Sequence, residues 1–145
     1  MNCSNKGLAF IMEFEGVKLK AYPDPATGGE PWTVGVGHTG PEVIEGFEIT
    51  EVQALDYLRA DIETAEKCIN QCVTDTLTQD QFDALCSFVF NLGCGNFRKS
   101  TLLKKINEED DVAASLEFLK WDRAAGKVMA GLTRRRIAES ELFLA

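Results

Sequence analysis

The stretch Glu15 to His38, EGVKLKAYPDPATGGEPWTVGVGH, decides the fold because two strand-like runs flank a segment that must turn. Apolar residues alternate with lysines over residues 17–21, which is the two-residue period of a half-buried β-strand. Residues 23–31 then supply three prolines and two glycines, which interrupt regular structure. Residues 32–38 form the second run. The stretch therefore predicts a β-hairpin that carries carboxylates, hydroxyls and the only histidine of the chain.

An apolar helix is predicted directly before the hairpin. Ser4 is a candidate N-cap, and apolar residues follow at helical spacing from Leu8. Glu15 continues that apolar face, and Gly16 is placed to end the helix. A carboxylic acid in such a position is costly to ionise, because burial and the negative helix end both disfavour its charged form. Such a group suits general-acid catalysis. The alternative is that Glu15 points to solvent or pairs with a nearby lysine.

Asp24 and Thr33 supply a second carboxylate and a hydroxyl near the end of this helix. Asp24 stands where the turn begins and Thr33 stands on the returning run, so we expect them to face each other across the hairpin. Gly35 and Gly37 fall on one face and leave room for a ligand or another backbone. Two carboxyl groups in unlike environments are the working groups of a glycosidase. From the residues alone, Asp24 between two prolines fits a turn residue better than a catalytic one.

The same stretch forms a longer ordered pattern. It comprises Glu15-Gly16, Leu19, Tyr22, Asp24 and Thr33-Val34-Gly35-Val36-Gly37-His38. This pattern resembles the Glu/Asp/Thr motif of the phage-type lysozymes, the endolysins of glycoside hydrolase family 24. The likeness extends over residues 80–93 and 132–143, and the long Pro/Gly-rich segment is similar to the lambdoid-phage variant.

The resemblance implies hydrolysis, with inversion, of the β-1,4 bond between N-acetylmuramic acid and N-acetylglucosamine in peptidoglycan. It implies Glu15 as the general acid, Asp24 as the base or electrostatic partner and Thr33 as the group that positions water. No cofactor and no metal ion are implied. Two rival functions remain open: a lytic transglycosylase, which needs no second carboxylate, and a catalytically silent module that only binds the wall.

The resemblance also implies residues outside the hairpin. Asp61 matches an aspartate that pairs with the histidine of the Gly-x-Gly-His motif, so we expect His38 to bond Asp61 and to have a raised pKa. The alternative for His38 is an isolated surface histidine. Substrate-binding residues are predicted further along the chain: Phe90, Asn91, Ser100 and Trp121. The alternatives are a satisfied buried amide for Asn91, helix capping for Ser100 and core packing for Trp121.

The expected fold is α+β and lysozyme-like, in one domain of 145 residues. A lobe of helix and hairpin covers about residues 1–49, with a third short strand near Val43–Ile44. A capping box at Thr50 opens one long helix over about residues 50–73, which joins a helical lobe over about residues 74–145.

In the helical lobe, Thr78 opens a second capping box. An apolar helix follows it as far as Gly93. Later helices are predicted to start at Ser100, at Asp110 or Asp111, and at Thr133, with a loose connection before the last.

Charge and composition narrow the classes of partner. The net charge of −8 argues against a nucleic-acid binder, although a basic cluster near the C-terminus could attract an anionic chain. That cluster is Arg123, Lys127, Arg134, Arg135 and Arg136. No run is long enough to span a membrane or to serve as a signal peptide. We therefore expect a monomer in the host cytoplasm, and the resemblance implies holin-type release to the wall.

The five cysteines are an odd number without a secretory signal, so free thiols are the expected state. Cys68 and Cys72 stand one helical turn apart, but a single histidine and the lack of a Cys-x-x-Cys motif argue against a metal site. A cysteine nucleophile is disfavoured too, because it requires the same histidine.

Overall fold

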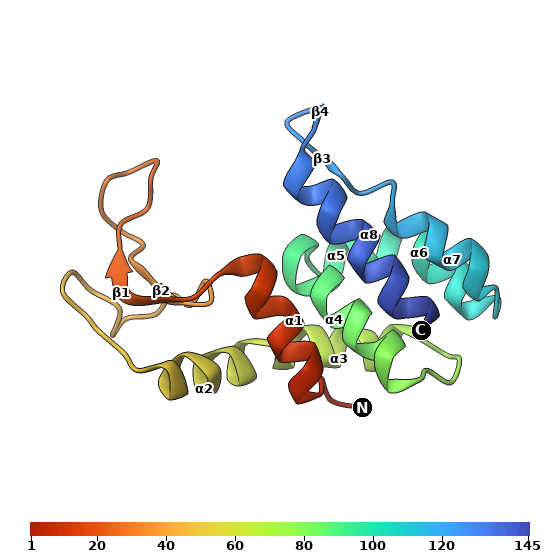
Figure 1. Cartoon of the computed structure of the whole chain (residues 1–145), viewed down its shortest axis with the longest axis horizontal. Helices are drawn as coiled ribbons and strands as arrows, with labels where there is room; N and C mark the ends of the chain where they lie inside the picture. Colours follow the sequence, from red (N-terminus) through yellow and green to blue (C-terminus); the bar gives the residue numbers. More distant parts are fainter. The chain divides into compact units, whose positions relative to one another are not determined.

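A computed structural model describes all residues, 1–145 (Figure 1). Its helices are α1 (Asn5–Glu15), α2 (Glu51–Asp61), α3 (Glu63–Cys72), α4 (Gln79–Leu92), α5 (Cys94–Lys99), α6 (Thr101–Asn107), α7 (Asp111–Phe118) and α8 (Ala130–Leu144). Its strands are β1 (Lys18–Tyr22), β2 (Thr33–Gly35), β3 (Arg123–Ala124) and β4 (Lys127–Val128). No helix has both the length and the apolar character needed to cross a bilayer.

The chain folds as two compact units. One unit is Leu8–Glu63, and the other combines Met1–Gly7 with Thr64–Ala145. The first holds the hairpin and the second is almost entirely helical, so the predicted α+β class is confirmed. The unit limits differ from the predicted lobes because α2 packs on β2, whereas α3 is joined by a disulfide to α5.

The predicted helix over about residues 50–73 is interrupted. Thr50 opens α2 with the expected capping box, but the helical hydrogen-bond pattern stops after Asp61 and resumes at Glu63. Ile62 keeps right-handed helical angles, φ −71° and ψ −16°, and its N–H still bonds the Leu58 carbonyl at 2.8 Å. The interruption is therefore confined to one residue. Ile62 is itself buried, so the helical spacing of apolar residues continues across the interruption and predicted a single helix.

The hairpin of Leu8–Glu63 is shorter than predicted. β1 pairs antiparallel with β2, with Tyr22 opposite Thr33, and an irregularity in register lies between the paired ends. Beyond Gly35 the chain does not continue as a strand, because Val34 and His38 exchange both backbone hydrogen bonds at 2.9 Å and close a tight turn. Gly35 and Gly37 take the positive φ that this turn needs, 65° and 71°.

The predicted third strand near Val43–Ile44 is wrong. The backbone of Lys20 instead forms an isolated bridge with Glu48, later in the chain. Val43 is buried in the core beneath the hairpin, with Ala21, Val34, Ile49 and Ala54. Val43 is therefore a loop residue that fills the core.

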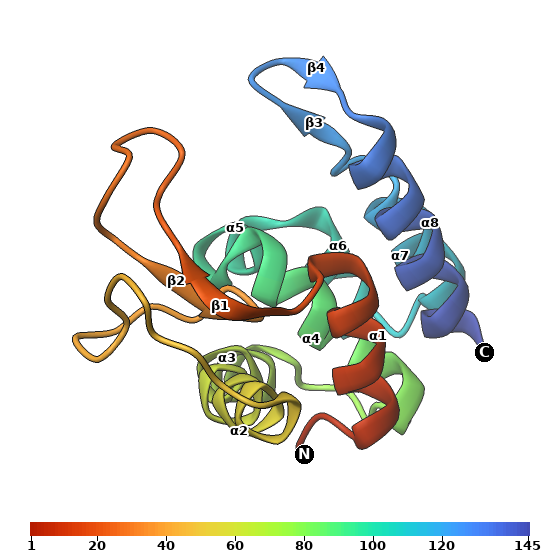
Figure 2. The same ribbon diagram turned by 60° about the vertical axis from the view of Figure 1, so that its left-hand side comes forward.

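The helical unit is built around α4. Thr78 supplies the predicted capping box, and every residue from Gln81 to Val89 is buried. α8 packs along α4, and α7 packs on α8 (Figure 2). The last helix begins at Ala130 rather than after Thr133, because the expected loose connection is the short β3–β4 hairpin and Gly131 already lies in the helix.

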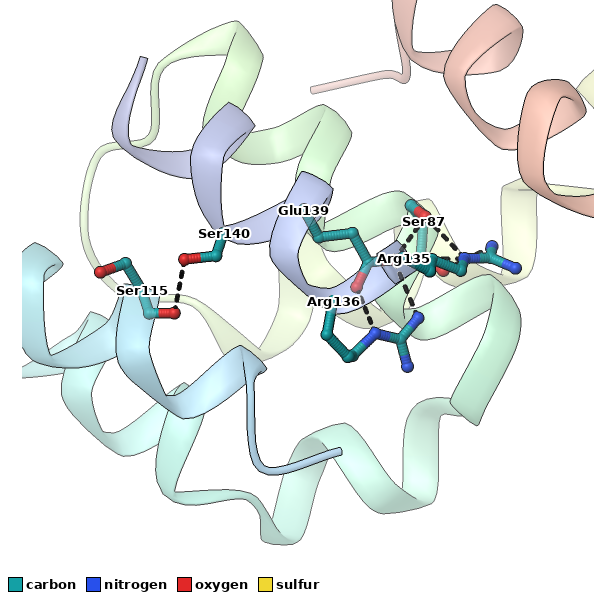
Figure 3. A network of polar contacts seen from close by, with 6 residues as sticks. All are labelled: Ser87, Ser115, Arg135, Arg136, Glu139 and Ser140. Carbon is teal, nitrogen blue, oxygen red and sulfur yellow. Dashed lines mark hydrogen bonds and ion pairs between the residues drawn. The ribbon is translucent and has the colours of Figure 1, made fainter. Parts of the chain in front are cut away.

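A buried charged network joins α8 to α4 (Figure 3). Arg135 and Arg136 were predicted to contribute to an exposed basic cluster, but their exposures are 5% and 0%. Both contact the fully buried Glu139, which also accepts a hydrogen bond from Ser87. Burial raises the pKa of Glu139, while the two guanidinium groups and the Ser87 hydroxyl oppose that shift. The predicted basic surface is therefore smaller than the sequence suggested.

The cysteines are not all free. Cys68 on α3 and Cys94 on α5 form a disulfide, with their Cα atoms 6.0 Å apart. Cys3, Cys72 and Cys86 remain thiols. The expectation of five free thiols was wrong because the fold brings two residues separated by 26 positions together, which spacing alone does not reveal.

The start of α1 is held against α4. Ser4 caps the helix as predicted, because the Gly7 N–H donates to its hydroxyl at 3.1 Å. The buried carboxylate of Asp83 accepts hydrogen bonds from both the backbone N–H and the hydroxyl of Ser4. Gln79 donates to the same carboxylate at 2.9 Å. These contacts bring the backbone at Gly7 very close to α4.

We expect Gly7→Ala to destabilise the protein although alanine is the better helix former. A Cβ at Gly7 would lie 2.6 Å from both the Asp83 Cγ and the Cys3 Sγ. The resulting overpacking costs about 1–3 kcal/mol of unfolding free energy. Urea denaturation measures it, with Gly131→Ala as control, because a Cβ there meets nothing within 4 Å. The control should gain roughly 0.5–1 kcal/mol, and a gain at both positions would contradict the expectation.

Candidate functional site in the hairpin unit

Glu15 is the last residue of α1, as the sequence predicted. Gly16 ends the helix with φ 76°, and its N–H donates to the Met12 carbonyl at 2.8 Å. The predicted burial of Glu15 is wrong, because the residue is exposed. The core face of α1 ends with Ile11, at 0% exposure, one turn before Glu15. Exposure places this carboxyl group where a ligand can reach it.

Asp24 lies just past β1, at the start of the loop that crosses to β2. Its backbone N–H donates to the Gly29 carbonyl at 2.9 Å, and its own carbonyl accepts from the Gly28 N–H at 2.8 Å. The carboxylate Oδ1 accepts from the Ala26 N–H at 2.7 Å. This local turn fixes a half-buried carboxylate at the edge of the hairpin.

Thr33 begins β2, and its strand partner is Tyr22. The predicted direct pairing of Thr33 with Asp24 is therefore not formed, because the ladder ends at Tyr22 and Asp24 follows two residues later. Both residues nevertheless lie at the same end of the two-stranded ribbon.

Gly35 leaves room for a backbone rather than for a ligand. A Cβ built on it would lie 3.4 Å from Ile49 Cδ1 and 3.7 Å from the Ala54 Cα of α2. Gly37 has nothing within 4 Å of such an atom, so its positive φ alone explains the glycine. Only Gly35 therefore allows the hairpin to pack closely on α2.

His38 bonds Asp61, as predicted. Its Nδ1 lies 2.8 Å from Asp61 Oδ2, and its Nε2 lies 2.8 Å from Glu42 Oε1. The ring stacks on Tyr57, with ring centroids 3.9 Å apart. Burial alone lowers the pKa of His38, but the hydrogen bonds and charges of Glu42 and Asp61 outweigh burial and raise the pKa above its usual value.

Sequence reasoning missed two partners of His38. Glu42 lies in the loop after the hairpin. A carboxylate four residues after a histidine in a loop does not by itself indicate that the two side chains are in contact. Tyr57 could have been found, since it precedes Asp61 by four residues and therefore shares its face of α2. The histidine joins the hairpin turn to α2 through Asp61 and to the loop that follows through Glu42.

Replacing His38 by asparagine should remove a pH-dependent part of stability. Because the folded-state pKa is raised, the stabilisation from the charged imidazole is complete below the unfolded pKa, about 6.5. It is lost as pH rises through the folded pKa. Urea denaturation from about pH 5 to pH 9 measures it. The wild-type advantage over His38→Asn should shrink with rising pH, whereas a constant difference would argue against a charged imidazole.

The predicted substrate-binding residues lie in the helical unit. Phe90 and Asn91 are half-buried near the end of α4. The Oδ1 of Asn91 is buried and has no hydrogen-bond partner in the structure.

Ser100 and Trp121 each make contacts within the helical unit. The Ser100 hydroxyl donates to the Phe97 carbonyl at 2.6 Å and accepts from the Leu103 N–H at 3.0 Å, so it caps α6. Trp121 packs edge-on against Phe88, with ring centroids 5.6 Å apart. These contacts match the alternatives of capping and core packing. No group of three or more His, Cys, Asp or Glu side chains is placed to hold a metal ion.

The chain is similar to known phage proteins over its whole length. The family model for phage lysozyme matches residues 12–139. The endolysin of Acyrthosiphon pisum secondary endosymbiont phage 1 is 46% identical over 147 residues, covering 99% of this chain and 98% of that protein. The endolysin of Bacillus phage PZA is 42% identical, but this chain spans only 55% of its length.

Solved structures agree with this similarity. The crystal structure of a P22 lysozyme variant superposes with a TM-score of 0.93 at 37% identity, covering 100% of this chain and 99% of that one. The chain therefore belongs to the phage lysozyme family, whose enzymes degrade peptidoglycan, and it has the lysozyme-like α+β fold.

Proposed function

We propose that this chain hydrolyses the β-1,4 bond between N-acetylmuramic acid and N-acetylglucosamine, with Glu15 as the general acid. One observation carries the proposal: Glu15 is exposed at the end of α1 in the same unit as Asp24 and Thr33. A general acid must reach the glycosidic oxygen, so a fully buried carboxyl group would fail. Bound sugar then excludes water from the acid.

Asp24 and Thr33 act on the side of the sugar from which the water molecule attacks. The Asp24 carboxylate accepts a proton from the attacking water or stabilises the positive charge that develops on the sugar. Its position is set by the turn that bonds Oδ1 to the Ala26 N–H. Thr33 follows on β2 and offers a hydroxyl that can orient the water molecule.

Asn91 and Phe90 are the proposed sugar contacts. The free acceptor on Asn91 Oδ1 suits an acetamido N–H or a sugar hydroxyl. Phe90 directly precedes Asn91 in the sequence and is half-buried. It offers an aromatic ring to a sugar face. We do not retain Ser100 in this role, because its hydroxyl already donates and accepts within the α6 cap.

Inversion is part of the proposal, and the anomeric form of the first product tests it. Proton NMR of fresh digests should show the α-anomer of the new reducing end first, with the β-anomer appearing by mutarotation. An initial β-anomer would indicate retention and a covalent intermediate, which needs carboxyl groups only about 5 Å apart. Exclusively 1,6-anhydro ends would instead establish the transglycosylase alternative.

The silent binding module is the second alternative, which the acidic charge of −8 favours slightly. Release of reducing ends from purified wall distinguishes it, because a module that only binds releases none. For access to the wall we propose holin-type release, which predicts that lysis of expressing cells requires a membrane-permeabilising partner.

A further inference from the structure

A recess in the helical unit has no part in the chemistry described above. Its volume is about 270 Å³, and it lies between α3 and α5. Six residues line it: Thr64, Lys67, Cys68, Gln71, Cys94 and Arg98. Its size is below the range of about 300–1,000 Å³ that is typical of drug-sized ligands, so it suits a group no larger than an amino acid.

Helical spacing explains why these side chains converge. On α3 the lining residues recur at three- and four-residue intervals from Thr64 to Gln71, so they share one face. On α5 Cys94 and Arg98 are four residues apart and also share a face. The disulfide between Cys68 and Cys94 joins the two faces and holds the helices together.

The recess is cationic in an acidic protein. The chain has a net charge of −8, yet the lining holds a lysine and an arginine and no carboxylate. Arg98 donates one hydrogen bond across the recess, from Nη2 to Gln71 Oε1 at 3.2 Å. A guanidinium group has five N–H donors, so further donors can serve an anion. An anionic group would also relieve the repulsion between the two cations.

We propose that this recess binds a carboxylate of the peptidoglycan stem peptide. The proposal rests on the proposed function, which supplies a substrate whose stem peptides carry free D-glutamate and D-alanine carboxylates. Lys67 provides a point charge, Arg98 provides directed N–H donors, and the hydroxyl of Thr64 and the amide of Gln71 complete a polar lining. The glycan backbone is held elsewhere, so the recess affects affinity for peptide-bearing wall and leaves the bond-breaking step unchanged.

Kinetics on two substrates test the proposal. The double variant K67Q/R98Q is compared with wild type on intact purified wall and on the same glycan after an amidase has removed the stem peptides. On intact wall KM should rise roughly fivefold, because each exposed ion pair contributes modestly. On peptide-free glycan KM should stay unchanged, and kcat should stay unchanged on both substrates. The control K99Q/K104Q removes two exposed charges of the same unit that do not line the recess.

Each outcome decides the matter. An unchanged KM on intact wall, an equal rise on both substrates, or an equal rise in the control would overturn the proposal. If wild type released no reducing ends from either substrate, the proposed function itself would fail. A direct measurement adds to this: the free tetrapeptide should shift amide NMR signals of α3 and α5 more than its carboxamide form or inorganic phosphate does. Equal shifts would refute recognition of the carboxylate.

Discussion

Glu15→Gln is expected to lower the rate of reducing-end release from peptidoglycan by roughly 10²–10⁴-fold. Glutamine keeps the size of the side chain but cannot donate the proton that the leaving oxygen requires. Glu15 is exposed, so the substitution leaves the buried core of the protein unchanged. The rate is measured on purified wall at saturating substrate, which reports kcat.

The same helix supplies a matched control. Glu13 is also exposed on α1, two residues earlier, and Glu13→Gln removes the same charge from the same helix. We expect near-wild-type activity from this control. Both variants should unfold within about 0.5 kcal/mol of wild type. Equal activity of the two variants would remove Glu15 from the mechanism, and an unstable Glu15→Gln would show that its role is structural.

Glu139→Gln is expected to have the largest effect on stability. Glu139 has 0% exposure and lies between two buried guanidinium groups (Figure 3). Its Oε2 is 3.0 Å from Arg136 Nη2 and 3.4 Å from Arg135 Nε. Its Oε1 lies 2.7 Å from Arg136 Nε, an ion-pair distance without hydrogen-bond geometry. Glutamine keeps the shape of the side chain and removes the charge that balances the arginines.

Loss of one member of a buried ion pair costs about 3–5 kcal/mol of unfolding free energy. For a chain of this size that corresponds to a fall of roughly 10–16 °C in Tm. Thermal and urea denaturation measure both quantities. Glu141→Gln is the control, because Glu141 is exposed on the same helix two residues later and should change stability by less than about 0.5 kcal/mol.

Ser87→Ala tests the smaller part of the network. It removes the hydroxyl that donates to Glu139 but leaves the ion pairs in place. We expect a loss of about 1–3 kcal/mol, which is less than for Glu139→Gln. If Glu139→Gln and Ser87→Ala both unfolded like wild type, the network would make no net contribution to stability.

Most signals within a few residues were read correctly from the sequence, although the helix start predicted at Thr133 was wrong. Ser4, Thr50, Thr78, Ser100 and Asp110 all begin helices as predicted, because a cap is a hydrogen bond to an N–H two or three residues away. Gly16 ends α1 for a similarly local reason. The contact between His38 and Asp61 was predicted only through the resemblance, since 23 residues separate them.

The errors concern contacts between distant parts of the chain. The spacing of apolar residues placed Glu15 on a buried face, but only the packed core decides that burial stops at Ile11. Likewise, the arginines near the C-terminus looked like a basic surface, although two of them are buried against Glu139. In both cases the environment of a side chain depends on which other segments pack against its helix. The sequence of the helix alone does not specify those segments.

The sequence by itself predicted the first helix and the hairpin after it, the central helix α4 and most of the helix caps, because each depends on neighbours along the chain. Tertiary structure alone decided the pairing of Cys68 with Cys94, the two carboxylates on His38 and the charged network on Glu139. These arise when segments tens of residues apart are brought together, and the free energy that selects them comes from burial of the whole core rather than from any one segment.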